Sequence, residues 1–213
     1  MDKNKVHNII KLLAETYPQA KCDLNYQTPF QLLIATILSA QTTDQNVNKV
    51  TAQLFAEYPT PQKLLQIPVS KLEKIINPIG LYKTKAKRIL ETCEILVREY
   101  NGEVPSDIDK LTKLPGVGRK TANVVLANAF KIPAFPVDTH VKRVAKRLGL
   151  TNETDPEKVE RDLTNLIPSE YWIDIHHRLI YHGRKTCMAR KPKCNSCPLN
   201  SNCSYYLTSY LTT

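Results

Sequence analysis

Lys120 follows a glycine-rich turn at the point where a helix is predicted to begin. The turn, from Leu114 to Gly118, reads LPGVG between two helical patterns. Its glycines let a ligand approach the backbone amides closely, and the positive end of the helix that starts near Arg119 points to the same place. A phosphate would therefore bind well here. The same surroundings favour a neutral amine at Lys120, which could attack a carbon atom and form a Schiff base.

Simpler interpretations of this segment stay open from the residues alone. Gly116 and Gly118 could serve only a tight turn between helices, and Lys120 could only contact phosphate. A nucleotide-binding P-loop is excluded, because that motif requires glycine at the positions of Leu114 and Arg119.

Asp138 is the single acid between Lys110 and Arg147, a stretch that contains nine Lys and Arg residues. A carboxylate held among cations could stabilise a positively charged transition state or activate a nucleophile. Asp138 also precedes an apolar helical stripe, where Asp commonly serves as the N-cap of a helix. The two roles are compatible with each other.

Four of the six cysteines lie close together, with the spacing C-x6-C-x2-C-x5-C. Thiolates at such intervals suit tetrahedral zinc or a [4Fe–4S] cluster, and the spacing alone does not choose between them. Two disulfides would require an oxidising compartment, and the N-terminal sequence lacks the apolar stretch of a signal peptide. We therefore expect a cytoplasmic protein whose metal ligands are Cys187, Cys194, Cys197 and Cys203.

The charge is strongly positive, at +10 from 30 Lys and Arg against 20 Asp and Glu. An excess of this size favours a polyanionic partner, above all nucleic acid. A second basic block, Arg184 to Lys193, contains five Lys and Arg residues and no acid. The longest apolar run, Leu32 to Ala40, is too short to cross a bilayer, so no membrane is expected as partner.

Helical periodicity dominates the chain, and alternating strand patterns are rare, which predicts an all-α fold. Asp44 is a candidate N-cap, and Ser70 with Glu73 has the spacing of a capping box. Asn101-Gly102 and Gly149 are placed to end helices, and Lys131 to Pro136 resembles a linker. The predicted helices cover residues 9–13, 30–38, 47–55, 61–66, 70–76, 83–100, 108–113, 119–130, 141–148, 156–167 and 171–182.

Several motifs together resemble the endonuclease III family of DNA glycosylases over nearly the whole chain. They are LPGVGRKTANVV, PVDTH and HGRKTC with the cysteine spacing, together with LSAQTTD, IGLYKTKA and NGEVP, and they match the pattern of the family in order and spacing. The resemblance implies the helix-hairpin-helix DNA glycosylase fold, with two helical lobes and a cleft between them. A six-helix lobe would span residues 22–132, with the hairpin motif at about 108–130. Residues 1–21 and 133–213 would form the second lobe, with a cluster loop at 187–203.

The resemblance also implies a role for each matching residue. Lys120 would be the nucleophile and Asp138 the catalytic carboxylate, while the four cysteines would bind a [4Fe–4S] cluster. Gln41 and Leu81 would fill the space that a flipped base leaves behind. The remaining contacts to DNA would come from the hairpin and the cluster loop, through Leu114, Gly116, Gly118, Arg119, Arg190 and Lys191.

The implied function is that of a bifunctional DNA glycosylase and AP lyase of base excision repair. It would remove oxidised pyrimidines, such as thymine glycol, from duplex DNA and also act at abasic sites. Lys120 would displace the base through a Schiff base, and β-elimination would then cut the strand 3′ to the abasic site. We expect a monomer of bacterial origin that works on the nucleoid.

Two other classes of protein compete with this interpretation. A non-enzymatic DNA-binding module with a zinc site explains the basic blocks and the cysteines, but not a lysine and a carboxylate within a basic surface. A small iron–sulfur electron carrier explains the cysteines, but neither the charge of +10 nor the hairpin.

Overall fold

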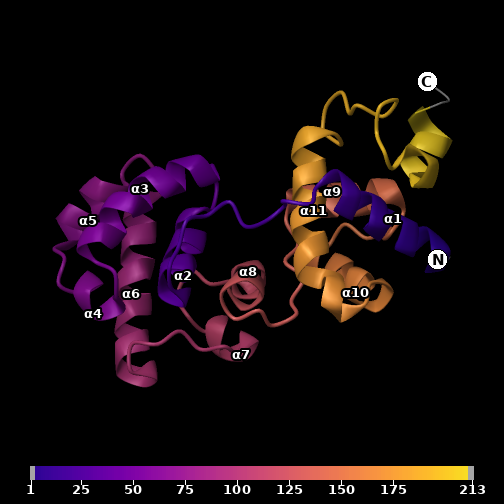
Figure 1. Ribbon diagram of the computed structural model, residues 1–213. Helices are drawn as coiled ribbons and strands as arrows, with labels where there is room; N and C mark the ends of the chain where they lie inside the picture. The colour runs from indigo at the N-terminus through magenta and orange to yellow at the C-terminus, as the bar shows by residue number, and fades with distance from the viewer. Residues whose placement is uncertain (1–2, 211–213) are drawn as a thin grey trace. The chain divides into compact units, whose positions relative to one another are not determined.

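The protein is helical throughout the part of the chain that the computed structural model describes, residues 3–210, and no strand occurs there (Figure 1). No helix in this range is long and apolar enough to span a membrane. The chain forms two compact units. One unit contains Cys22–Ile132, and the other contains the described residues up to Lys21 together with those from Pro133 onward. The predicted all-α class is confirmed.

The unit formed by Cys22–Ile132 is built around α2, whose residues Phe30 to Leu38 are all buried. A helix that is apolar on every side must be enclosed, and full burial of each Leu or Ile contributes roughly 1.5–3 kcal/mol. Thr28 caps its first turn. Helices α3, α6 and α8 pack against α2, while α4 and α5 pack on α6. The seven helices here are α2 (Pro29–Leu38), α3 (Asp44–Glu57), α4 (Pro61–Leu64), α5 (Val69–Ile76), α6 (Tyr82–Tyr100), α7 (Ile108–Leu111) and α8 (Arg119–Ala129).

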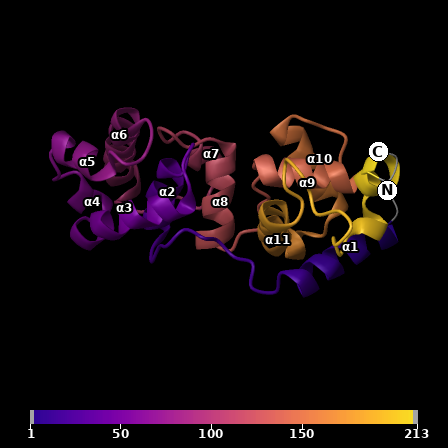
Figure 2. The same ribbon diagram turned by 90° about the horizontal axis from the view of Figure 1, so that it is seen from above.

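The other unit is organised around α11, which packs against both α9 and α1 (Figure 2). Its core joins the N-terminal helix to the last third of the chain, with Ile9, Leu13, Phe135, Val141 and Leu179 all buried together. Lys5 reaches Ser204 with a hydrogen bond of 3.1 Å. The helices are α1 (Lys3–Thr16), α9 (Thr139–Leu148), α10 (Pro156–Leu166) and α11 (Trp172–Lys185), with shorter turns at η1 (Ser169–Tyr171), η2 (Asn200–Asn202) and η3 (Tyr206–Tyr210).

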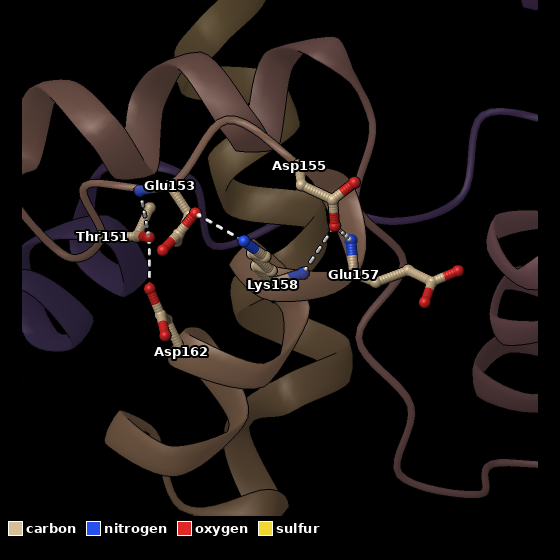
Figure 3. Close-up of polar contacts among 6 residues, drawn as sticks. All are labelled: Thr151, Glu153, Asp155, Glu157, Lys158 and Asp162. Carbon is tan, nitrogen blue, oxygen red and sulfur yellow. Dashed lines mark hydrogen bonds and ion pairs between the residues drawn. The ribbon is translucent and has the colours of Figure 1, made fainter.

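The acidic segment at the start of α10 is bonded locally (Figure 3). Asp155 caps the helix by accepting hydrogen bonds of 3.1 Å from the backbone N–H groups of Glu157 and Lys158. Thr151 donates to Asp162 and accepts from the backbone of Glu153. Asp155 stabilises the positive end of α10, while Asp162 fastens the loop before the helix through Thr151, so both carboxylates serve the fold.

Two predicted helix starts are wrong. Thr43, and not Asp44, caps α3, because the Thr43 hydroxyl accepts the backbone N–H of Asn46 while Asp44 is already helical. Ser70 lies inside α5, which begins at Val69 after Pro68 and has no side-chain cap. In both places the first helical residue lies within two positions of the predicted one, which is the usual spread at a helix terminus. The helix α11 also extends beyond the predicted His182 to Lys185.

Gly149 ends α9 in a conformation that only glycine adopts easily, with a φ of +77°. The N–H of Leu150 returns to the carbonyl of Ala145, as in a Schellman motif. A Cβ atom at this position would lie 2.3 Å from the Ser204 hydroxyl oxygen. We expect Gly149→Ala to lower the free energy of unfolding by about 1–2 kcal/mol from backbone strain alone, measured by urea denaturation.

The matched control for this substitution is Gly80→Ala, because Gly80 has no positive φ and an added Cβ there would meet no atom within 4 Å. We expect it to change stability by less than about 0.5 kcal/mol. Equal stability of the two variants would contradict the role assigned to Gly149.

Candidate functional site

The predicted hairpin consists of two helices joined by a short turn. Helix α7 ends at Leu111, and α8 begins at Arg119 with Gly118 as its N-cap. No side chain caps α8, and a Cβ at Gly118 would meet nothing within 4 Å. The first amides of α8 therefore border open space, where the positive end of the helix favours an anion.

The turn is hydrogen-bonded to α6 through its backbone. Thr92 donates a hydrogen bond of 2.9 Å to the carbonyl oxygen of Pro115. Gly116 has a φ of +79°, and a Cβ there would lie 3.1 Å from Cδ of Arg88. Both observations explain why a glycine occupies this position: the backbone turns left-handed and passes close to a neighbouring helix. The turn is thus rigidly held while its outer side stays exposed.

Lys120 is exposed in the first turn of α8, and Arg119 beside it is exposed as well. Leu114 was expected to contact DNA, but its side chain is only 3% exposed and belongs to the core. The main chain of Leu114 is bonded within the turn as well, because its N–H donates to the carbonyl oxygen of Leu111 and its carbonyl oxygen accepts the N–H of Val117, both at 3.1 Å. Gly116 and Gly118 are exposed, so their amides remain accessible.

Asp138 is the N-cap of α9, and its Oδ1 accepts the backbone N–H of Val141 at 2.7 Å. The N-cap interpretation from the sequence is therefore confirmed. Oδ1 is held by the helix, while the carboxylate has a second oxygen with further acceptor capacity. Asp138 and Lys120 belong to different units of the chain.

Gln41 and Leu81 share an unusual backbone conformation. Both residues have a φ of +60°, in the left-handed region that non-glycine residues rarely occupy. Both are exposed, and Leu81 exposes 61% of its surface, the largest fraction among the exposed large apolar residues described. Leu81 directly precedes α6, and Gln41 follows the end of α2. Strained, exposed residues of this kind are common at functional sites.

The four cysteines at the C-terminal end line one pocket and form no disulfide. Burial raises the pKa of Cys197 to about 11 and also raises the pKa values of Cys194 and Cys203. Four thiolates can share this pocket only if a cation balances their charge, so the donor set fits a metal group.

Four thiols that line one pocket can bind either a single zinc ion or a [4Fe–4S] cluster. The pocket therefore indicates a metal group without choosing between the two.

Arg147 fastens the loop that carries the first cysteine. Its guanidinium donates to the carbonyl oxygens of Met188 and Ala189, at 2.7 and 3.1 Å, and to the sulfur of Cys187 at 3.4 Å. It also lies over the ring of Tyr205, 4.8 Å from the centroid. The loop continues into Arg190 and Lys191, which are exposed, and Lys191 has a φ of +49°. These two cations are thus presented to solvent by an anchored loop.

The comparison with known proteins decides between the interpretations. Residues 34–169 match the HhH-GPD superfamily of base excision DNA repair proteins, and residues 187–203 match the iron-sulfur binding domain of endonuclease III. Endonuclease III of Escherichia coli is 48% identical over 205 residues, which cover 96% of this chain and 97% of the relative. The chain belongs to the endonuclease III family. Endonuclease III of Synechocystis is 51% identical over 94% of the chain and 92% of its own length.

Solved structures of endonuclease III have the same fold. A trapped endonuclease III–DNA covalent intermediate superposes with a TM-score of 0.92 at 48% identity, and it covers 97% of this chain and 98% of its own. A non-covalent endonuclease III–DNA complex superposes with a TM-score of 0.93 at 47% identity over the whole of both chains. The predicted helix-hairpin-helix glycosylase fold and the predicted iron–sulfur group are both confirmed.

Metal analysis provides a direct prediction for this endonuclease III family member. We expect the purified protein to contain about four irons and four acid-labile sulfides per chain and to absorb visible light. Cys194→Ser should remove most of the iron, whereas Cys22→Ser should keep it, because Cys22 does not line the pocket. About one zinc per chain without sulfide would contradict the cluster.

Sequence reasoning missed two residues that the structure places at the candidate site. Lys85 lies four residues before Ile89 and eight before Cys93, in phase with the apolar face of α6. This spacing is the sequence signal that could have predicted a buried lysine. Arg147 is one of several basic residues of α9, and its position in the sequence did not predict that it would bind a loop 40 residues away.

Proposed function

We propose that this protein is a bifunctional DNA glycosylase and AP lyase of base excision repair, which removes oxidised pyrimidines from duplex DNA. The observation that carries the proposal is Lys120, an exposed amine in the first turn of α8, directly behind a hairpin with open backbone amides. A relative with 48% identity has been captured as a covalent intermediate with DNA, which requires a nucleophilic side chain.

In the proposed reaction, the neutral Nζ of Lys120 attacks C1′ of the damaged nucleoside. The bond between C1′ and the base breaks, and the base leaves with the electron pair and takes up a proton. Asp138 stabilises the positive charge that develops on the sugar and assists this proton transfer. The nitrogen loses one proton, its electron pair breaks the bond between C1′ and the ring oxygen, and that oxygen takes up a proton, which leaves a protonated imine between Lys120 and C1′.

Strand cleavage follows from the imine. The protonated imine withdraws electrons from C2′, so a C2′ proton can leave to a base. The electron pair then forms a double bond between C2′ and C3′ and expels the 3′ phosphate, which is β-elimination. Water releases Lys120 by hydrolysis of the imine. The lysine is thereby regenerated, and the enzyme turns over without an external oxidant or reductant.

The other site residues bind DNA in this proposal. The amides of Gly116 and Gly118 and the cation of Arg119 hold the phosphate backbone, and Leu114 contributes by anchoring the turn that presents these amides. Gln41 and Leu81 enter the duplex where the damaged base has left the stack. Arg190 and Lys191 contact phosphates from the loop that Cys187, Cys194, Cys197 and Cys203 stabilise through the cluster, which supplies folding energy when it is bound.

We further propose that the unit formed by Cys22–Ile132 is the lobe with the hairpin, although it contains seven helices, two of them of only four residues, where six were expected, and that the other unit is the cluster lobe. That second lobe would also include residues 1–2 and 211–213, which lie outside the described residues. The protein would act as a monomer on double-stranded DNA of the nucleoid that carries damaged bases or abasic sites. The relatives described above come from bacteria, which supports this setting.

Borohydride trapping tests the proposed function, because borohydride reduces an imine to a stable covalent bond. We expect the wild-type protein to form a covalent band with a duplex that contains one thymine glycol and with one that contains an abasic site. A band with the abasic duplex alone would refute the base specificity and leave the lyase chemistry standing. Folded, cluster-loaded protein that traps neither duplex would refute the proposal in favour of a non-enzymatic DNA-binding module.

A further inference from the structure

Lys85 is buried more deeply than any other charged residue whose burial the structure describes. Its side chain is 4% exposed, and every other Lys, Arg, Asp or Glu in that range is at least partly exposed. Burial lowers the pKa of Lys85 below that of an exposed lysine. A buried ammonium group is unfavourable unless polar partners replace its water, and an apolar residue at this position would pack without that penalty.

Two backbone carbonyls replace the water around Lys85. Its Nζ donates hydrogen bonds of 2.9 Å to Leu38 and 2.6 Å to Ala40. Leu38 is the last residue of α2, whose final carbonyls lack partners within the helix, and the negative end of a helix favours a cation. Lys85, which lies on α6, therefore binds the carbonyl groups at the C-terminal end of α2, more than 40 residues earlier in the sequence.

The same residue is also bonded to the turn at the start of α6. The backbone N–H of Lys85 donates to the carbonyl oxygen of Leu81 at 3.0 Å. Ala40, which accepts from the side chain, directly precedes Gln41. The bond to Leu81 is the first intrahelical bond of α6, which any residue at position 85 would make, and it fixes the stem of Lys85 one turn after Leu81. From there the side chain reaches the carbonyl directly before Gln41, so the lysine side chain joins the start of α6 to the Gln41 loop.

We propose that Lys85 is a positioning residue, which holds the Gln41 loop and the Leu81 turn as one preformed surface that enters the duplex together. The inference rests on the proposed function, in which these two side chains occupy the space left by the flipped base. Two independent loops would have to be ordered when DNA binds, and that ordering would weaken binding. A preformed pair avoids this loss.

The chemistry of lysine suits this role. Gln41 and Leu81 have a left-handed backbone conformation, which L-residues keep only when the surrounding structure restrains them. Glycine would adopt this conformation more easily, but it has no side chain to enter the duplex. A lysine has a long stem that packs among apolar residues and several donors at its tip, so it can reach two carbonyls at once. Methionine would have a stem of similar length but no donor.

Fluorescence of 2-aminopurine tests the proposal. The duplex carries a tetrahydrofuran analogue of an abasic site, which cannot be cleaved, with 2-aminopurine opposite. We expect wild-type protein to change the fluorescence when its side chains enter the gap. Lys85→Met should raise the apparent Kd by about tenfold and reduce the fluorescence change at saturation. Lys87→Met removes the same charge from an exposed position on α6 and should match wild type.

A double-mutant comparison separates positioning from general stability. When Gln41→Ala and Leu81→Ala are already present, Lys85→Met should change the apparent Kd by less than about twofold, because nothing is left to position. The full tenfold loss in that background would show that Lys85 only stabilises the fold, and it would overturn the proposal. Thermal denaturation confirms that each variant is folded at the temperature of measurement. If Lys85→Met does not fold, Lys85→Gln replaces it, because the amide keeps one donor group.

The test distinguishes failure of this inference from failure of the proposed function. The binding measurement needs no chemistry, so protein that passes it but forms no borohydride-stable band refutes the proposed function alone. Protein that is trapped normally but shows an additive effect of Lys85→Met refutes the role of Lys85 alone. Wild-type protein without a fluorescence response also overturns the positioning role.

Discussion

Lys120→Gln should bind an abasic duplex yet form no borohydride-stable adduct, and its strand cleavage should fall by about 10³-fold or more. Glutamine keeps most of the side-chain length but has no nucleophilic electron pair on nitrogen. Lys120 is exposed in the first turn of α8, so the substitution removes little packing. The loss should therefore appear in the chemical step, measured by single-turnover cleavage at saturating protein.

The matched control is Lys110→Gln, which removes the same charge from an exposed position in α7 of the same hairpin. We expect this variant to bind DNA slightly more weakly at low salt and to form the adduct as wild type does. An adduct that persists in Lys120→Gln would assign the nucleophile to another amine and would contradict the mechanism proposed above.

Asp138→Asn should separate the two functions of this carboxylate. Asparagine is as good an N-cap as aspartate, so the hydrogen bond to the N–H of Val141 can persist and the stability should hardly change. The negative charge, however, is lost, and base excision should fall by about 10²–10⁴-fold in kcat. Asp138→Ala should lose this activity and also about 1 kcal/mol of stability, since the cap disappears with the charge.

Asp155 provides the control for this experiment, because it caps α10 in the same way without a proposed catalytic role. Asp155→Asn should leave stability and activity nearly unchanged, whereas Asp155→Ala should lose about 1 kcal/mol of stability and keep its activity. Thermal denaturation and single-turnover excision of thymine glycol measure the two quantities. Full activity of Asp138→Asn would limit Asp138 to its structural role.

Local sequence patterns were sufficient for the fold class and for the cofactor ligands. Helical periodicity depends on residues three and four positions apart, so it predicted helices throughout the chain even where their first residues were wrong. The glycine turn before Arg119 and the cap at Asp138 are equally local, and both lie where the sequence places them. The ordered motifs identified the family, which the relatives confirm.

Tertiary structure alone decided which partners these residues meet. The cysteine spacing did not show that all four thiols line one pocket with Arg147 beside them, because that arrangement depends on packing between α9 and the C-terminal loop. Leu114 was expected at the DNA surface, yet its side chain lies in the core. Lys85 and Arg147 gained their roles through hydrogen bonds to residues at least 40 positions away. Periodicity records which face of a helix is buried, but the carbonyl or sulfur that a buried cation reaches depends on packing between helices.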